Sequence, residues 1–245
     1  MSSGHDAVKA IFWDNDGVLV DTEQLYFQVT QQVLATAGVR LTDEEYVELF
    51  LVQGRGAWHL AEERGIPAEE IDRLRDRRNT IYGEALARAP LVLSGVRSVL
   101  DELHGKYVMG IVTTCSREHF EVIHQSSGLL GYFDFVLLPG DYPRKKPHPD
   151  PYLCAVERSG VERTACVAVE DSERGLASAT AAGLRCLVVP TSLTRGRAFA
   201  GAYRILDAVT DVPSALEPFS FRRGPERAEP RPILRGIKAT RSNDK

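Results

Sequence analysis

The second half of this chain alternates short apolar runs with segments of helical spacing, and this alternation limits the available folds more than any other feature. The apolar runs that we expect to be strands are residues 107–113, 133–138, 166–170 and 186–189. The segments with helical spacing are residues 96–104, 117–127, 149–159 and 173–182. Strands that alternate with helices form βαβ units, which build a parallel sheet. A further apolar run near the N-terminus, "AVKAIFW", predicts one more strand of the same sheet.

A segment with helical signals alone lies between the first predicted strand and the alternating half. The stretch from Thr22 has apolar residues at helical spacing and stops at Gly38, a residue typical of the position just past a helix end. Thr42 and Glu45 then form a capping-box pattern. We therefore expect an α/β fold in which a Rossmann-like parallel-sheet core, with helices on both faces, is interrupted by an all-helical domain. The expected domains are the core at residues 1–21 and 91–216, and the helical insert at residues 22–90.

The composition is that of an ordinary globular protein and excludes several classes. Hydrophobic residues make up 43% and charged residues 26% of the 245 residues, which excludes disordered and fibrous chains. The apolar runs are much shorter than the roughly 18 residues that a membrane span needs, and the N-terminus has no secretory apolar region. We therefore expect a cytoplasmic protein. The four cysteines have neither CxxC pairing nor zinc-site spacing, so we expect no disulfide framework and no structural metal.

The net charge of −4 is unevenly distributed along the chain. Residues 217–245 carry eight Lys or Arg against four acids, so this basic tail has a charge of +4 and the remainder −8. With Pro, Gly and few apolar residues, the tail is expected to be a mobile extension. An acidic body is a poor partner for nucleic acid, so we do not expect nucleic-acid binding. A monomer is the simplest expectation.

Polar residues follow the predicted strands of the core. Those that could carry chemistry are Asp14 and Asp16 after the first strand, Thr113, Thr114 and Ser116 at the end of the second, Lys146 in a loop, and Glu170, the last residue of "CVAVE", with Asp171 after it. The carboxyl ends of parallel strands meet at one edge of a sheet, where ligands of open α/β folds bind. Buried acids are costly unless they are paired or bound to metal, so fold stability does not explain this set.

The combination of these side chains favours one kind of chemistry. Carboxylates that lie close together repel one another unless a cation sits among them. Mg²⁺ takes oxygen ligands and is often held by carboxylates together with a substrate phosphate. Thr113 and the backbone N–H of Thr114 could hold phosphate oxygens, and Lys146 supplies a compact positive charge. The residues therefore predict a phosphoryl-transfer site.

Four stretches of the sequence carry a family resemblance. In chain order, they read "DNDGVLVDTE", "GIVTTCSREHF", "KKPHPDPY" and "VAVEDSERGLASATAAG". These stretches resemble the four motifs of the haloacid dehalogenase superfamily, in the branch that contains β-phosphoglucomutase-like and phosphoglycolate-phosphatase-like enzymes. The resemblance covers the core from Val8 to about Val189, and the helical insert resembles the cap domain of that branch.

The resemblance implies a role for each matching residue. Asp14 would be the nucleophile that accepts the phosphoryl group, and Asp16 the general acid and base. Thr113 would hydrogen-bond the phosphoryl group, and Lys146 would neutralise Asp14 and the transferring oxygens. The implied Mg²⁺ ligands are Asp14, the backbone carbonyl of Asp16, Glu170 and Asp171.

The resemblance leaves more than one reaction open. Asp16 argues against the dehalogenases, which lack this second aspartate, and against phosphonate hydrolases, which usually have a small residue there. In β-phosphoglucomutases a histidine stands five residues after the last aspartate of the first motif, where this chain has Tyr26. We therefore predict a Mg²⁺-dependent phosphatase acting on a small phosphorylated sugar or sugar acid. The alternatives are a sugar phosphomutase and a phospho-ligand-binding or regulatory protein without turnover.

Two features of the insert bear on the substrate. Arg55 and Arg78 occupy positions similar to those that meet the sugar phosphate in the mutases, so we expect them to contact the substrate. Residues 20–22 and 90–94 join the insert to the core, and we expect the insert to open and close over the site about these two crossings. Cys115, next to Thr114, is expected close to the phosphate pocket.

Overall fold

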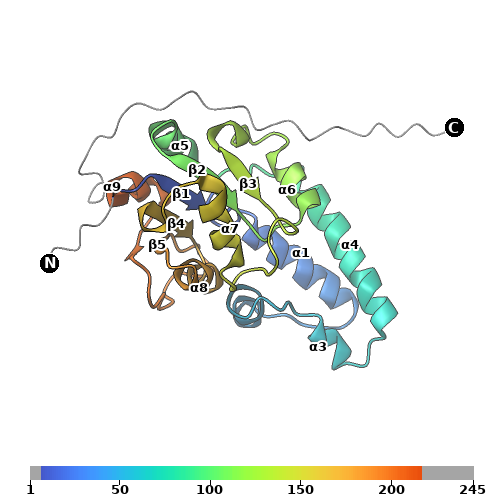
Figure 1. Ribbon diagram of the computed structural model, residues 1–245. Helices are drawn as coiled ribbons and strands as arrows, with labels where there is room; N and C mark the ends of the chain where they lie inside the picture. Colours follow the sequence, from blue (N-terminus) through green and yellow to red (C-terminus); the bar gives the residue numbers. More distant parts are fainter. Residues whose placement is uncertain (1–6, 217–245) are drawn as a thin grey trace.

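The computed structural model describes residues 7–216, and the predicted basic tail lies outside this range. A six-stranded sheet forms the centre of the molecule (Figure 1). Its strands are β1 (Ala10–Trp13), β2 (Val108–Val112), β3 (Phe135–Leu137), β4 (Cys166–Glu170), β5 (Arg185–Val188) and β6 (Arg204–Ile205). They lie in the order β3-β2-β1-β4-β5-β6, and every neighbouring pair is parallel. This arrangement confirms the predicted α/β fold class.

Strand β1 shows why the apolar runs lack polar alternation. All four of its residues are completely buried. Ile11 and Trp13 pack on one face of the sheet against α5 (Val96–Leu103), α6 (Arg117–His124) and α9 (Val212–Leu216). Ala10 and Phe12 pack on the other face against α7 (Asp150–Ser159) and α8 (Glu173–Ala181). Helices cover both faces of β1, so this strand needs apolar residues at every position.

The described core differs from the sequence expectation mainly at its ends. Strand β1 begins at Ala10, three residues later than predicted, and no pattern in the sequence predicted β6 or α9. Strand β6 is two residues long and exposed, so it has no apolar run to mark it. Short 3-10 turns occupy Leu130–Tyr132, Arg163–Ala165 and Val209–Asp211.

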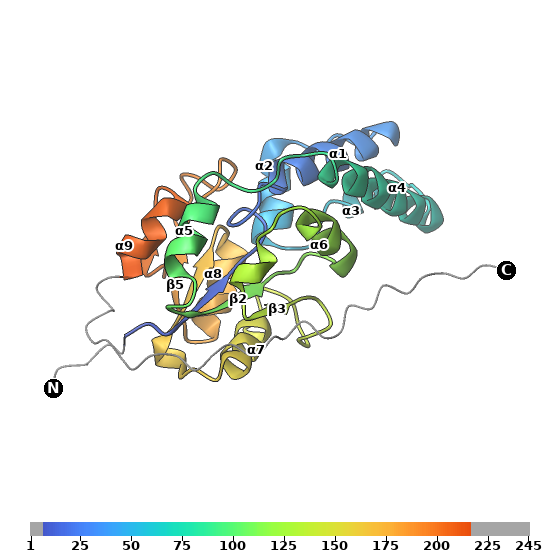
Figure 2. The same ribbon diagram turned by 90° about the horizontal axis from the view of Figure 1, so that it is seen from above.

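All secondary structure described between residues 23 and 86 is helical. It consists of α1 (Glu23–Thr36), α2 (Asp43–Tyr46), a π-helical segment η1 (Val47–Val52), α3 (His59–Glu62) and α4 (Ala68–Leu86). Gly38 takes φ +70° just past the end of α1, and both hydrogen bonds of the Thr42–Glu45 capping box form, as predicted. Figure 2 shows α1 and α4 side by side at one end of the molecule. Among residues 7–216, no helix has the length and apolar character that crossing a membrane requires.

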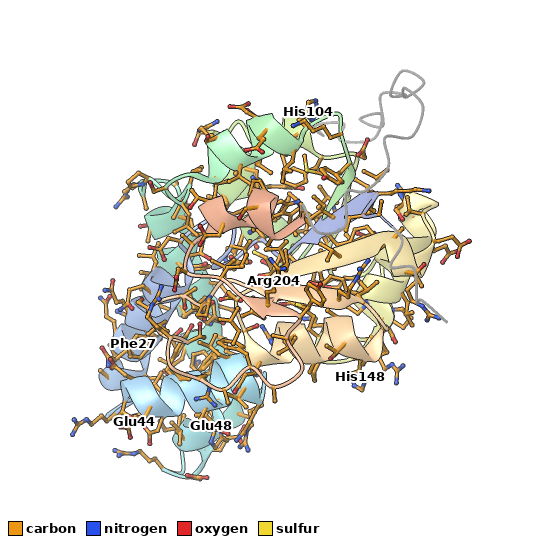
Figure 3. All side chains as sticks on the ribbon, turned by 90° about the vertical axis from the view of Figure 1, so that its left-hand side faces the viewer. Phe27, Glu44, Glu48, His104, His148 and Arg204 are labelled. Carbon is orange, nitrogen blue, oxygen red and sulfur yellow. The ribbon has the colours of Figure 1, made fainter. Side chains whose placement is uncertain are left out.

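The two chain crossings between the helical insert and the core run beside each other. Val20 and Val92 form an antiparallel bridge. The Asp21 N–H donates to the Leu91 carbonyl at 2.7 Å, and the Leu93 N–H donates to the Leu19 carbonyl at 3.1 Å. In Figure 3, Phe27 and Glu48 of the insert lie far from His104, which is at the opposite end of the core. The insert is therefore joined to the core by two chain segments that run side by side and are hydrogen-bonded to each other.

Candidate active site

The loop after β1 brings the first acidic pair to the edge of the sheet. The Asp14 N–H donates to the Val169 carbonyl at 2.9 Å, which extends the contact between β1 and β4 to the first aspartate. These two strands flank the point where the strand order reverses, the usual ligand site of such sheets. Gly17 has φ +83°, and a Cβ there would lie 2.2 Å from Oδ2 of Asp171. A glycine therefore lets the β1 loop approach the acids that follow β4.

Lys146 connects these two acidic segments. Its buried Nζ lies 2.6 Å from Oδ1 of Asp14 and 2.7 Å from Oε1 of Glu170, and it donates to the Val112 carbonyl at 2.8 Å. Burial alone would lower the pKa of Lys146, but Asp14 and Glu170 outweigh burial, and the pKa is raised. Lys146 is therefore held as a cation between two carboxylates.

Three carboxylates form a cluster that could hold a metal ion. Asp14, Glu170 and Asp171 are buried, and each has an oxygen within 4.8 Å of the others. Oε1 of Glu170 accepts a hydrogen bond from Tyr152 Oη at 2.5 Å, whereas Oε2 is buried without a hydrogen-bond partner among residues 7–216. A Cβ at Gly175 would lie 1.8 Å from Oε2, so the carboxylate sits against bare backbone. Clustered oxygen donors with an unpartnered oxygen fit a hard divalent cation such as Mg²⁺.

The electrostatics of the cluster also favour a cation. Burial, followed by the charges of Asp14 and Glu170, raises the pKa of Asp171 well above its ordinary value. Burial also raises the pKa of Glu170, although Lys146 opposes the shift. A single lysine therefore does not neutralise this group of acids.

Asp16 is held by three donors from three parts of the chain. Thr22 Oγ1 donates to Oδ1 at 2.5 Å, while Thr113 Oγ1 and Asn15 Nδ2 donate to Oδ2 at 3.2 and 3.3 Å. Burial and the nearby charge of Asp14 raise the pKa of Asp16, and the three hydrogen bonds oppose this rise. A carboxyl group in this setting is suited to hold and release a proton beside Asp14.

The other polar residues after β2 lie around Thr113. Thr113 is buried, and its Oγ1 also accepts the Cys115 N–H at 3.0 Å. Thr114 is half-buried, and Ser116 caps α6 by accepting the His119 N–H at 3.4 Å. Burial, then the charges of Asp16 and Asp14, raises the pKa of the Cys115 thiol well above its ordinary value. Cys115 is therefore a protonated thiol that lies close enough to Asp14 and Asp16 for their charges to act on it.

The two arginines predicted to contact substrate occupy different settings in the insert. Arg78 is buried, with its guanidinium 4.5 Å from the ring centre of Tyr26, and its Nε donates to Asn79 Oδ1 at 3.0 Å. Its Nη1 is buried without a hydrogen-bond partner in the described part of the chain. Arg55 lies in the exposed loop that follows η1. Arg78 therefore offers a buried donor, whereas Arg55 is open to solvent.

The family model described as haloacid dehalogenase-like hydrolase matches residues 11–189. This chain belongs to that family. Protein CbbY of Rhodobacter capsulatus is 32% identical to it over 222 residues, covering 85% of this chain and 97% of the relative. A phosphorylated carbohydrates phosphatase of Thermotoga maritima is 29% identical, covering 81% of this chain and 94% of the relative.

A solved structure extends the comparison to three dimensions. A mutant of CbbY from Rhodobacter sphaeroides, in complex with xylulose-(1,5)bisphosphate, superposes with a TM-score of 0.70. The two chains are 28% identical, and the match covers 83% of this chain and 96% of the other. The resemblance inferred from the four motifs, and with it the hydrolase class, is confirmed.

The sequence analysis did not predict that two further charged residues, Arg174 and Glu23, lie beside the site of this hydrolase. Nε of Arg174 is buried without a hydrogen-bond partner among residues 7–216, and a Cβ at Gly54 would lie 2.9 Å from its Cδ. Burial raises the pKa of Glu23 to about 7, although its hydrogen bond from Tyr46 Oη and the charge of Arg174 lower it. Both residues look like ordinary charges in the first turns of helices, so only the fold shows that they face the site.

Proposed function

We propose that this hydrolase is a Mg²⁺-dependent phosphatase that cleaves a small phosphorylated sugar or sugar acid through a phosphoaspartate on Asp14. The observation that carries the proposal is Lys146 bound between Asp14 and Glu170, with Asp16 held nearby by a hydrogen bond from Thr113. The carbohydrate phosphatase among the relatives, and the sugar bisphosphate bound to the CbbY mutant, support the same substrate class.

The first half-reaction transfers the phosphoryl group to the protein. An oxygen of Asp14 attacks phosphorus, the bond between phosphorus and the ester oxygen breaks, and Asp16 gives its proton to that oxygen. Lys146 reduces the repulsion between the Asp14 carboxylate and the anionic phosphoryl group. The Thr113 hydroxyl, which donates to Asp16 in the free protein, would turn to a phosphoryl oxygen, and Thr114 and Ser116 would supply further donors from the β2 end. The alcohol then leaves.

The second half-reaction returns the enzyme to its starting state. Asp16, now ionised, takes a proton from water as the water oxygen attacks phosphorus and the bond to Asp14 breaks. Inorganic phosphate leaves, so one ester and one water give one alcohol and one phosphate. Asp16 therefore ends protonated and Asp14 free.

Mg²⁺ would be held by Asp14, the Asp16 carbonyl, Glu170 and Asp171. When bound, it would offset negative charge on the cluster and on the transferring phosphoryl oxygens. Oε2 of Glu170, which is buried without a hydrogen-bond partner among residues 7–216, supports this assignment.

The helical insert would serve as the cap that selects the substrate. We assign residues 22–90 to this cap and residues 1–21 with 91–216 to the catalytic core. Arg78 and Arg174 each have a buried nitrogen without a partner among residues 7–216, which supports contacts to the end of the substrate remote from the reacting phosphate. Arg55, in the exposed loop next to Gly54, would add a further contact to the substrate. A cytoplasmic location and a monomeric state are part of the same proposal.

Phosphate release from a panel of sugar phosphates, sugar bisphosphates and phosphorylated sugar acids tests the proposal, with and without Mg²⁺. The Asp14→Asn variant is expected to be inactive, while Asp43→Asn, at an exposed acid of α2, keeps wild-type activity. Activity that survives Asp14→Asn contradicts the phosphoaspartate. Conversion of a hexose 1-phosphate to its 6-phosphate without phosphate release identifies a mutase, and binding without turnover identifies a non-catalytic protein.

A further inference from the structure

Asn15, between the two aspartates, takes part in a buried hydrogen-bond chain that the catalytic steps above do not use. Its side chain is completely buried. Nδ2 of Asn15 donates to Oδ2 of Asp16 at 3.3 Å, and Oδ1 lies 2.8 Å from Nε2 of His124. His124 is the last residue of α6, 109 positions further along the sequence. The amide therefore links Asp16 to a helix on one face of the sheet.

The chain continues beyond the imidazole. Nδ1 of His124 lies 2.9 Å from Ser127 Oγ, and Ser127 Oγ accepts the Leu129 N–H at 3.1 Å. His124 and Ser127 are both buried, and the ring of Phe120 packs 4.3 Å from the imidazole centre. Every polar atom of these side chains that faces the core thus has a partner.

The partners fix the direction of each hydrogen bond. Because Nδ2 of Asn15 donates to Asp16, its Oδ1 must be the acceptor for His124, and Nε2 of His124 must carry the proton. Nδ1 is then the acceptor, and the Ser127 hydroxyl donates to it. Burial lowers the pKa of His124 to about 4, in agreement with a neutral ring that has one donor and one acceptor. Donation runs in one direction, from Leu129 through Ser127, His124 and Asn15 to Asp16.

The position at which this chain ends argues for a role in the reaction. If the Asn15 amide needed only hydrogen-bond partners for its buried polar atoms, groups inside the core could supply them all. Here the last bond leaves the core and reaches the carboxyl group that must exchange the proton. Thr22 and Thr113 bind Asp16 through hydroxyls that can rotate, whereas the Asn15 amide is planar and locked at its far end by His124.

We propose that Asn15, His124 and Ser127 are positioning residues that hold the Asp16 carboxyl group in line with the leaving-group oxygen. The inference rests on the proposed phosphatase function and adds to it residues from α6 and the turn after it. Loss of the chain would leave Asn15 free to turn, and Asp16 would keep only its two hydroxyl donors. The step that suffers is protonation of the leaving oxygen.

This role predicts a dependence on the leaving group that a purely structural role does not. A sugar alkoxide is a poor leaving group and needs the proton from Asp16, whereas p-nitrophenolate leaves without it. The quantity to compare is kcat/KM, because in this two-step scheme it covers the steps only as far as loss of the leaving group. The later role of Asp16 as a base then does not enter.

The experiment measures kcat/KM for p-nitrophenyl phosphate and for the sugar phosphate that the wild type hydrolyses fastest. His124→Phe keeps a ring but removes both hydrogen bonds, and it is expected to lower kcat/KM on the sugar phosphate about 10- to 100-fold, with less than about 3-fold loss on the aryl ester. His124→Gln, whose amide can still donate to Asn15, is expected to recover most of the difference. His104→Phe changes an exposed histidine at the far end of the core and is expected to match the wild type (Figure 3).

The outcomes separate the inference from the proposed function. Equal losses on both esters, no loss on either, or no recovery in His124→Gln would overturn the positioning role. If circular dichroism shows that His124→Phe is unfolded, Ser127→Ala tests the outer end of the chain, and a folded variant without the leaving-group difference overturns the role equally. A wild type that hydrolyses neither ester contradicts the phosphatase proposal itself.

Discussion

The carboxyl ends of β1 and β4 and the helical insert above them are built in different ways. At the strand ends, Asp14, Lys146 and Glu170 come from three separate parts of the sequence, and Nζ of Lys146 lies 2.6 Å from Asp14 and 2.7 Å from Glu170. In the insert, Arg78 is buried with an unpartnered nitrogen in the described chain, and Arg55 is exposed. The reacting groups are thus fixed by one another, whereas the groups expected to meet the rest of the substrate have contacts still to make. This difference supports the proposed division, in which the strand ends carry the chemistry and the insert carries the selectivity.

Removal of Lys146 should give the largest effect. Lys146→Met leaves Asp14 and Glu170 without their buried cation, so we expect kcat to fall on the order of 10³-fold or more, as for other residues that act as part of a catalytic unit. Steady-state kinetics on the best sugar phosphate measures the loss. Lys145→Met, at the exposed neighbouring lysine, is the matched control and should retain activity. A Lys146→Met variant within tenfold of the wild type would show that the strand ends do not act as a unit.

The carboxylate cluster should respond to metal in a way that the insert does not. Asp171→Asn removes one acid from the buried cluster, so we expect a higher melting temperature for the metal-free protein and Mg²⁺ affinity lower by more than ~100-fold. Differential scanning fluorimetry with EDTA and with increasing Mg²⁺ checks both effects. Glu157→Gln, at an exposed acid of α7, should keep the Mg²⁺-dependent rise of the wild type. An unchanged Mg²⁺ response in Asp171→Asn would place the ion elsewhere.

His124 should make the core more sensitive to acid. Its pKa is about 4 in the folded protein against an ordinary value of 6.5, so the unfolded chain binds more protons between these values, and stability falls as the pH is lowered through this window. Between pH 7.5 and pH 5 the wild type should lose about 2 kcal/mol more unfolding free energy than His124→Phe. Urea unfolding of both proteins in saturating Mg²⁺ measures the difference. Parallel losses in the two proteins would mean that the imidazole is not held neutral.

The smallest effect is expected from the insert. Arg78→Met should raise KM for the sugar phosphate about tenfold and leave kcat within about threefold, because the lost contact binds the substrate without taking part in bond breaking. Arg77→Met, at the exposed neighbouring arginine, is the control. Initial rates over a range of substrate concentrations separate the two constants. A fall in kcat without a change in KM would place Arg78 among the reacting groups and remove the distinction between the two regions.

Much of the fold and the core of the candidate site could be predicted from local signals. A strand that is covered on both faces carries apolar residues on both, so β1, β2 and the first four residues of β4 stand out in the sequence. The acids at their ends stand out for the opposite reason, because polar residues directly after buried strands need an explanation. Strand β6 could not be found in this way, since it is short and exposed.

The sequence by itself determined the parallel α/β core, the order of its motifs and the acidic, basic and hydroxyl groups at the strand ends, because these depend on periodicity and on residue type. Only the tertiary structure decided which polar groups meet over long separations. No local pattern shows that Nε2 of His124, in α6, lies 2.8 Å from Oδ1 of Asn15. Nor does any local pattern show that the Arg174 side chain lies against Gly54. Such contacts depend on where two elements come to lie in space, and a local pattern of residues contains no measure of that distance.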